Sequence, residues 1–169
     1  MPNKTLIKVF AVLAVAAIVF ASFTTLGGDD SVTGTSSESV AGLPAVTDNA
    51  GQAPTITAPT GAAPTTLASQ DIIVGTGAEV LATSTLTVHY TLMTWSNGSV
   101  VESSWTGAQP ATFPLSGVIQ GWQQGLPGAK VGGRRLLVIP PDLGYGPKGS
   151  GPIGPNETLI FVVDIIGVS

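Results

Sequence analysis

The longest β-strand signal in the chain reads Leu-Ile-Phe-Val-Val-Asp-Ile-Ile-Gly-Val and covers residues 159–168. Apolar residues occupy both alternating sets of positions, and Asp164 is the one charged residue among them. A strand that is apolar on both faces is typical of the middle of a sheet, because water reaches neither face there. We therefore expect residues 159–168 to form a central strand.

Further segments carry the β-branched and aromatic residues of strands. Residues 85–95 alternate most clearly, with Val88 and Tyr90 on one face and His89 on the other. The Asn97-Gly98 pair that follows predicts a two-residue hairpin turn. The other expected strands cover residues 72–74, 100–102, 111–115 and 134–139.

One helix is predicted between these strands, over residues 118–126. Ile119, Trp122 and Leu126 recur at helical spacing on one side. Two glycines weaken this helix by about 1 kcal/mol each relative to alanine, so it needs a sheet to dock on. The sequence thus predicts an α+β domain, in which an antiparallel sheet of about five strands wraps around one short helix.

The 169-residue chain offers few groups for ionic chemistry. It has six Lys and Arg against ten Asp and Glu, a net charge of −4 and a sequence pI near 4.6. Nucleic-acid binding is not expected, because phosphates require a basic face. The absence of Cys excludes disulfides, Cys-based metal sites and a thiol nucleophile, and the single His leaves little for other metal sites.

Two zones precede the folded part, which we place at residues 70–169. Lys4 and Lys8 precede an apolar stretch, so residues 1–26 predict a cleaved signal peptide or, if uncut, a membrane anchor through residues 6–26. Both interpretations place the protein outside the cytoplasm, secreted or anchored facing outward. Residues 27–69 are rich in Gly, Ala, Ser, Thr and Pro, which predicts a disordered linker that is either a tether or a leader remnant.

The residues that stand out are aromatic. Tyr90, Phe113, Trp122, Tyr145 and Phe161 come from different predicted segments, and Tyr145 lies in a glycine-rich loop. Each one alone fits a core position, whereas the set predicts an apolar pocket.

Two ionisable residues admit two interpretations each. His89 faces away from Tyr90 and lacks a nucleophile motif, so a structural role is favoured over that of a general base. Glu102 follows an apolar pair and is either a pocket-rim residue or a solvated acid at a strand end.

A series of motifs between residues 70 and 169 carries a family resemblance. They are VHYT at 88–91, SS at 103–104, FPL at 113–115, VIQGW at 118–122, GL at 125–126, KVGGRR at 130–135, IPPDLGYG at 139–146 and NETLIF at 156–161. In this order and spacing the chain resembles FKBP-type peptidyl-prolyl cis–trans isomerases. The resemblance implies an antiparallel five-stranded half-barrel curled around a short helix, with an apolar pocket between them.

The resemblance also implies the residues of the site. Tyr145, Glu102 and Trp122 would be catalytic, with Trp122 beneath the substrate proline ring. The Tyr145 hydroxyl and the Ile119 backbone N–H would bind peptide carbonyl groups. The partners would be proline-containing polypeptide segments and macrolide immunosuppressants, without cofactor or metal. The substrate-binding residues would be Tyr90, Val101, Phe113, Val118, Ile119, Trp122, Ile153 and Phe161.

Departures from the family pattern leave alternatives open. Val101-Glu102 stands where many members have Phe-Asp, and the usual partner arginine is absent around Gly107. Ala111 replaces a frequent aromatic residue. The leading hypothesis is an exported isomerase that assists the folding of extracytoplasmic proteins. The alternatives are a peptide-binding or chaperone module with weak or no isomerase activity, and an envelope protein that uses the domain as a spacer.

Overall fold

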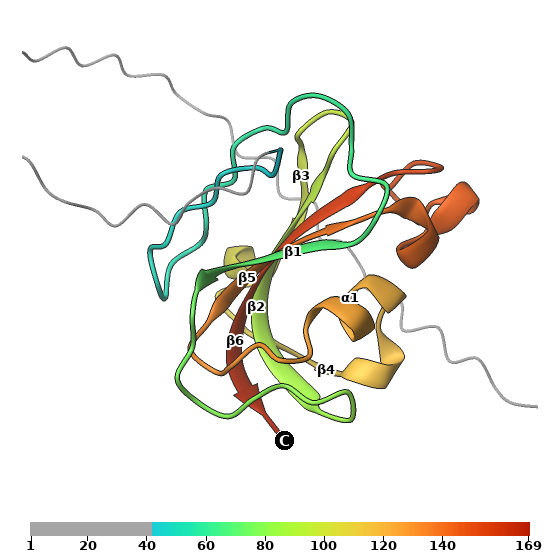
Figure 1. The fold of residues 1–169 in the computed structure, drawn as a ribbon. Helices are drawn as coiled ribbons and strands as arrows, with labels where there is room; N and C mark the ends of the chain where they lie inside the picture. Colours follow the sequence, from blue (N-terminus) through green and yellow to red (C-terminus); the bar gives the residue numbers. More distant parts are fainter. Residues whose placement is uncertain (1–41) are drawn as a thin grey trace, which may run out of the picture. The chain divides into compact units, whose positions relative to one another are not determined.

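The computed structural model describes residues 42–169, which form one antiparallel sheet with a short helix on one side (Figure 1). The strand order is β1-β5-β6-β2-β3, and β4 also pairs with β2. The sheet does not close into a barrel, and the α+β prediction is confirmed. The strands are β1 (Ala68–Ile73), β2 (Thr85–Thr94), β3 (Val100–Ser103), β4 (Ala111–Pro114), β5 (Arg134–Ile139) and β6 (Leu159–Val168).

Strand β6 lies in the middle of the sheet, as its sequence predicts. Phe161 faces Leu92 of β2 on one side and Leu137 of β5 on the other. Residues 159–165 are all buried. Each large apolar side chain removed from water in this way stabilises the fold by roughly 1.5–3 kcal/mol, so β6 anchors both halves of the sheet.

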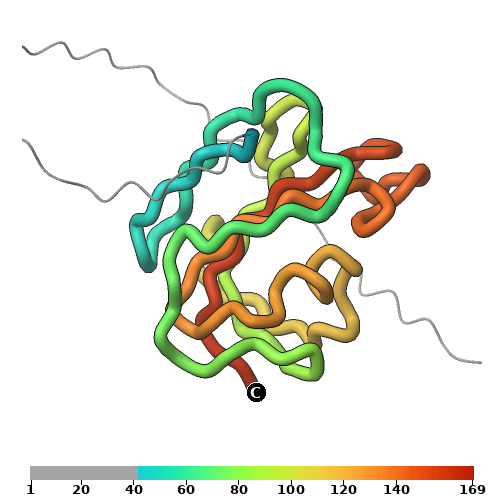
Figure 2. The backbone as a smooth tube through the Cα atoms, viewed as in Figure 1, coloured from blue at the N-terminus to red at the C-terminus, as the bar shows by residue number. Residues whose placement is uncertain are grey.

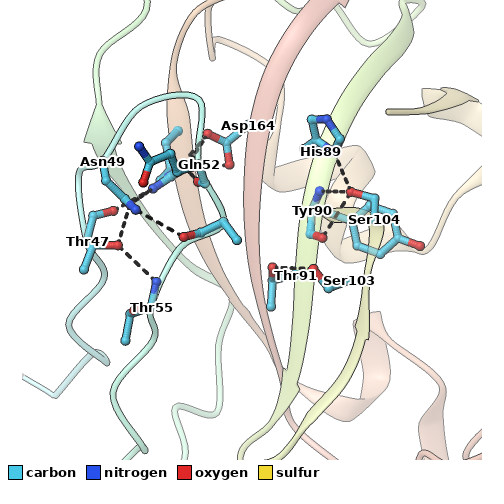
Figure 3. A network of polar contacts seen from close by, with 12 residues as sticks. Thr47, Asn49, Gln52, Thr55, His89, Tyr90, Thr91, Ser103, Ser104 and Asp164 are labelled. Atoms are coloured by element: carbon cyan, nitrogen blue, oxygen red, sulfur yellow. Dashed lines mark hydrogen bonds and ion pairs between the residues drawn. The ribbon is translucent and has the colours of Figure 1, made fainter. Parts of the chain in front are cut away.

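Two strands share the position beside β2, which gives six strands where about five were predicted. β3 pairs with β2 around Thr91, and β4 pairs with it around Thr87. Between them the chain leaves the sheet in the 3-10 turn Ser104–Gly107. There Ser104 Oγ accepts a hydrogen bond from the Tyr90 N–H at 2.9 Å (Figure 3). A side-chain oxygen thus replaces the missing strand partner of this N–H.

The hairpin between β2 and β3 is wider than the two-residue turn predicted. β2 ends at Thr94 and β3 begins at Val100, so residues 95–99 form the loop. A two-residue type I′ turn needs positive φ at both central residues. Gly98 has a φ of 62°, but Asn97 does not have a positive φ. Its side chain instead accepts a 2.6 Å hydrogen bond from Thr94 Oγ1, which stabilises the wider loop.

Helix α1 (Gln120–Gly125) is shorter than the helix predicted over residues 118–126. It starts later because Ile119 still has an extended backbone, with a ψ of 152°. α1 packs on the inner face of the sheet and closes the main apolar core (Figure 1). The buried members of that core include Leu86, Val88, Tyr90, Trp122, Leu126, Leu137, Ile139, Phe161 and Val163.

The two glycines of α1 lie where the helix approaches β5. A Cβ atom at Gly125 would lie 2.7 Å from Leu137 Cδ2, and one at Gly121 would overlap Ile139. These residues lower the helix propensity, as the sequence indicates, but they also let the helix backbone approach the strand closely. The helix therefore depends on the sheet for its stability.

Residues 42–63, the outer-face segment, pack on the outer face of the sheet, away from α1 (Figure 2). Val46 and Ile56 form an isolated β-bridge, and Trp95 Nε1 donates to Gly61 O at 3.3 Å. The disorder predicted over residues 27–69 is therefore wrong for residues 42–69. The segment has few apolar residues of its own, but it covers an apolar face that the sheet supplies. Ile56 forms a second core there with Met93, Trp95, Leu136, Val138, Ile160 and Val162.

The arginine of one buried ion pair in the sheet also binds this segment. Arg134 of β5 is fully buried, and its guanidinium contacts the Asp164 carboxylate of β6 at 2.9 Å. Its other N–H groups donate to Thr47 O, Asn49 Oδ1 and Gln52 O at 2.6–2.8 Å. Figure 3 shows Asn49 and Gln52 beside Asp164. A buried charge is tolerated when it is paired and hydrogen-bonded in this way.

The predictions for residues 1–26 and for the linker up to residue 41 lie outside the described residues. Between residues 42 and 169, no helix combines the length and the apolar character that a membrane crossing requires. The location of the protein outside the cytoplasm stays a prediction.

Candidate active site

Four aromatic rings from four different elements meet between the sheet and α1. The Trp122 ring centroid lies 5.3 Å from that of Phe161 of β6 and 5.8 Å from that of Tyr90 of β2. Phe113 of β4 lies 6.0 Å from Trp122. All three contacts are edge-to-face, with interplanar angles of 81–88°. Such contacts contribute about 0.5–1.5 kcal/mol each beyond burial, so the rings hold one another in place.

The apolar residues predicted to bind substrate all belong to the main apolar core that contains these rings or pack against it, and we call this set with the rings the ring cluster. Trp122 is 4% exposed, so the surrounding residues cover most of its surface. The ring cluster reaches the surface at its partly exposed members. The structure thus brings the predicted set together, and its role in binding stays a prediction. The buried members are Tyr90, Trp122, Ile153 and Phe161, and the partly exposed ones are Val101, Phe113, Val118 and Ile119.

Glu102 of β3 is hydrogen-bonded to the ring cluster. The Tyr90 hydroxyl donates to Glu102 Oε1 at 2.6 Å. Glu102 faces Leu92 in the β2–β3 pair, and Tyr90 precedes Leu92 by two residues on the same face of β2. The two side chains are therefore diagonal cross-strand neighbours. The sequence shows only that an arginine partner is missing, whereas the structure supplies a tyrosine.

Two tyrosines of the site are kept protonated by their surroundings. Burial raises the pKa of Tyr90, and the hydrogen bond to Glu102 raises this pKa further. Burial, and then the charge of Glu102, also raise the pKa of Tyr145. Tyr145 lies between the 3-10 turns Pro141–Leu143 and Gly146–Lys148 and is 36% exposed. Its side chain is therefore partly open to solvent, and its hydroxyl is a neutral donor.

Two N–H groups of the cluster have no acceptor among residues 42–169. One is Trp122 Nε1, which is buried. The other is the backbone N–H of Ile119, just before α1. A buried donor without an acceptor costs roughly 1–3 kcal/mol. Of these two donors, only the Ile119 N–H belongs to a partly exposed residue, so it is the one suited to orienting a ligand carbonyl.

His89 lies on the opposite face of β2 from Tyr90, as the alternation predicts. Its Nδ1 lies 3.0 Å from Ser104 Oγ, and its ring stacks on Trp105 with centroids 4.0 Å apart. Figure 3 shows His89 and Tyr90 both beside Ser104. Ser104 Oγ also accepts the hydrogen bond from the Tyr90 N–H, so this hydroxyl is used to bind the backbone of β2. This geometry supports a structural role for His89.

The other charged side chains of the sheet form structural pairs. Arg134 binds Asp164, and Arg135 binds Asp71 at 2.6 Å. In the described range 42–169, no group of three or more His, Asp or Glu residues could hold a metal ion. The polar groups near the rings are therefore the Glu102 carboxylate, the Tyr145 hydroxyl and the two unpaired N–H groups.

Comparison with known proteins agrees with this geometry. Residues 77–166 match the family model of the FKBP-type peptidyl-prolyl cis-trans isomerases. The chain is 48% identical over 113 residues to a probable FK506-binding protein of Corynebacterium glutamicum, which covers 67% of this chain and 96% of that relative. It is 45% identical over 95 residues to the outer membrane protein MIP of Legionella longbeachae, which covers 56% of this chain and 40% of that protein.

A solved structure shows the same architecture. The crystal structure of FkpA from Escherichia coli superposes with a TM-score of 0.58 at 39% identity, covering 61% of this chain and 48% of that chain. The segment that matches the family model, residues 77–166, contains α1 and all four rings. The chain therefore belongs to the FKBP-type peptidyl-prolyl cis–trans isomerase family.

Proposed function

We propose that this protein catalyses rotation about Xaa-Pro peptide bonds at the ring cluster and assists the folding of proteins outside the cytoplasm. One observation carries the proposal. Trp122 lies edge-on to three other rings, Ile119 with its unpaired N–H packs against the same core, and Tyr145 is near enough to Glu102 for the charge to raise the tyrosine pKa in addition to burial. This combination offers an apolar surface for a proline ring and donors for the carbonyl groups beside it.

The reaction suits such a site because it needs no acid, base or cofactor. The barrier to rotation is about 18–20 kcal/mol and comes from amide resonance. The twisted amide has lost this resonance and is less dipolar than the planar one. An apolar surface therefore favours the twisted state relative to the planar state, and binding that is stronger in the transition state accelerates the reaction.

Each site residue has a distinct role in this proposal. Trp122 contacts the proline ring from below, and the Ile119 N–H and the Tyr145 hydroxyl donate to carbonyl groups of the peptide. The raised pKa of Tyr145 keeps its hydroxyl protonated as a donor. Glu102 accepts a hydrogen bond from the Tyr90 hydroxyl. This bond fixes the orientation of the Tyr90 ring beside Trp122.

The location outside the cytoplasm and the drug class are parts of the same proposal. The basic start and apolar stretch of residues 1–26 support export. The relative from Legionella longbeachae is named an outer membrane protein, and that from Corynebacterium glutamicum is named FK506-binding. We infer that a macrolide such as FK506 competes with peptide for the ring cluster.

A second candidate is a peptide-binding or chaperone module with weak turnover. It is favoured by Val101, which leaves the partly exposed side of the cluster without a further ring. It is also favoured by Glu102, whose partner is a tyrosine rather than a cation. Binding without rate acceleration would distinguish this module from an isomerase.

A cis–trans assay of the full chain on Xaa-Pro peptides tests the proposal. We expect faster relaxation than in buffer alone and a loss of at least tenfold in Trp122→Ala, since truncating a central ring removes several kcal/mol of contact. His89→Gln, on the other face of β2, is the matched control and should keep the wild-type rate. Unchanged relaxation for every peptide, with the protein shown to be folded, would exclude isomerase activity.

A further inference from the structure

The carboxylate of Glu102 lies in the candidate site without a cationic partner. Its observed contact is the 2.6 Å hydrogen bond from the neutral Tyr90 hydroxyl. The ion pairs seen within residues 42–169 are Arg134–Asp164 and Arg135–Asp71, and neither involves Glu102. The negative charge is thus stabilised by a neutral donor but not neutralised.

This charge acts on the groups that would surround a substrate. It raises the pKa of both Tyr90 and Tyr145, and no positive charge offsets it at either hydroxyl. Tyr90 in turn lies 5.8 Å from the Trp122 ring. A residue next to a proline bound on Trp122 would therefore lie on the side of the site where Tyr90 holds an uncompensated carboxylate. In a partly desolvated site, charge interactions are screened less than on an open surface.

We propose that Glu102 makes the site selective for Xaa-Pro segments that carry a lysine or arginine directly beside the proline. This inference rests on the isomerase function proposed above and names its preferred substrates. A cationic side chain would be attracted to the carboxylate, and an acidic one repelled. Complementary charge of this kind determines which partner is preferred more than it determines overall affinity.

The test compares peptides that differ in one residue. Lys, Gln or Glu is placed directly before or directly after the proline, and kcat/KM is measured for the full chain at low salt. We expect the Lys peptide to exceed the Glu peptide by about three- to tenfold at one of the two positions. About 1 M salt should reduce this ratio toward one, because the Debye length then falls to about 3 Å.

Two variants locate the effect. Glu102→Gln should abolish the Lys-over-Glu preference. Glu79→Gln removes the same charge from an exposed loop residue and should leave the preference intact. A preference that survives in Glu102→Gln would overturn the inference, and so would equal kcat/KM for the Lys and Glu peptides of the wild-type chain.

The outcomes separate this inference from the function on which it rests. Equal acceleration of all peptides rejects the charge selectivity and leaves the isomerase function in place. No acceleration of any peptide rejects both. The salt dependence of the wild-type chain provides the test should Glu102→Gln fail to fold.

Discussion

Arg134 and Asp164 face each other on the neighbouring strands β5 and β6, and their ion pair also holds residues 47–52 through the Arg134 guanidinium. This pair links the outer-face segment to the two strands at the centre of the sheet. The stability of the sheet and the attachment of the segment therefore depend on the same side chain.

Arg134→Met should destabilise the fold strongly. It leaves the Asp164 carboxylate buried without its partner, and breaking a buried pair in this way costs roughly 3–5 kcal/mol in the free energy of unfolding. Urea unfolding of the full chain measures the loss. Asp71→Asn, which breaks the more exposed pair with Arg135, is the control and should cost no more than about 1 kcal/mol. Equal losses in the two variants would contradict the importance of the buried pair.

Ile56→Ala tests whether the outer-face segment, residues 42–63, is part of the folded unit. Ile56 is 9% exposed in the second core, so truncation should lower the free energy of unfolding by about 2 kcal/mol, at the low end for a buried isoleucine. The control is Val74, which is 75% exposed. Val74→Ala should change the free energy of unfolding by no more than about 0.5 kcal/mol. The same small effect for both would mean that the segment does not pack on the sheet in solution.

Val101→Phe should raise kcat/KM for Xaa-Pro peptides roughly two- to tenfold. Val101 is a partly exposed member of the ring cluster, and an added ring contact contributes about 0.5–1.5 kcal/mol. Val100→Phe places the same ring on the preceding residue, which is 56% exposed, and should leave the rate unchanged. A protease-free isomerisation assay reports both. If Val101→Phe has no effect, this side of the cluster does not limit the reaction.

The pH profile of the rate should reflect the raised pKa of Tyr145. The donor is lost only when the hydroxyl ionises, and burial and Glu102 move that ionisation above the ordinary tyrosine value of about 10. We expect kcat/KM to stay flat from about pH 6 to about pH 10 and to fall above that range. Tyr145→Phe should lower the plateau about three- to tenfold and remove the alkaline fall.

Glu102→Gln should shift the pKa of Tyr145 in the opposite direction. Removing the negative charge should lower the pKa of Tyr145, so the alkaline fall should begin at lower pH than in the wild-type chain. A fall that starts well below pH 9 in the wild-type chain, or that persists in Tyr145→Phe, would show that Tyr145 is not the titrating donor.

Local patterns in the sequence were sufficient to predict most of the sheet. Residues 134–139 and 159–168 begin and end as strands at the residues that the sequence predicts. The pattern could not reveal that one sheet position is divided between β3 and β4, because the division depends on Ser104 bonding to the backbone of Tyr90. The sequence likewise shows only that the glycines of α1 are unfavourable for a helix. The structure adds the reason for them, because Leu137 lies too close to Gly125 for a side chain there.

The outer-face segment was beyond prediction for a different reason. Its Ala, Thr and Pro residues carry no period, and their order is imposed by partners distant in the chain. Arg134 binds backbone and side-chain oxygens 82–87 residues earlier, and the apolar face under Ile56 includes Leu136. Similarly, the Tyr90–Glu102 contact requires the register of two strands, which composition does not contain.

The central place of β6 determines when the chain can fold. Among the strands of residues 42–169, β6 is the last along the chain, and it joins the β1–β5 pair to β2 with its neighbours β3 and β4. During synthesis the two halves of the sheet cannot pair through β6 until residues 159–168 have been made. Such long-range pairing is slow compared with local folding, and it exposes apolar strands in the meantime. Until β6 has been made, β5 and β2 each lack the strand that pairs with them at the centre of the sheet.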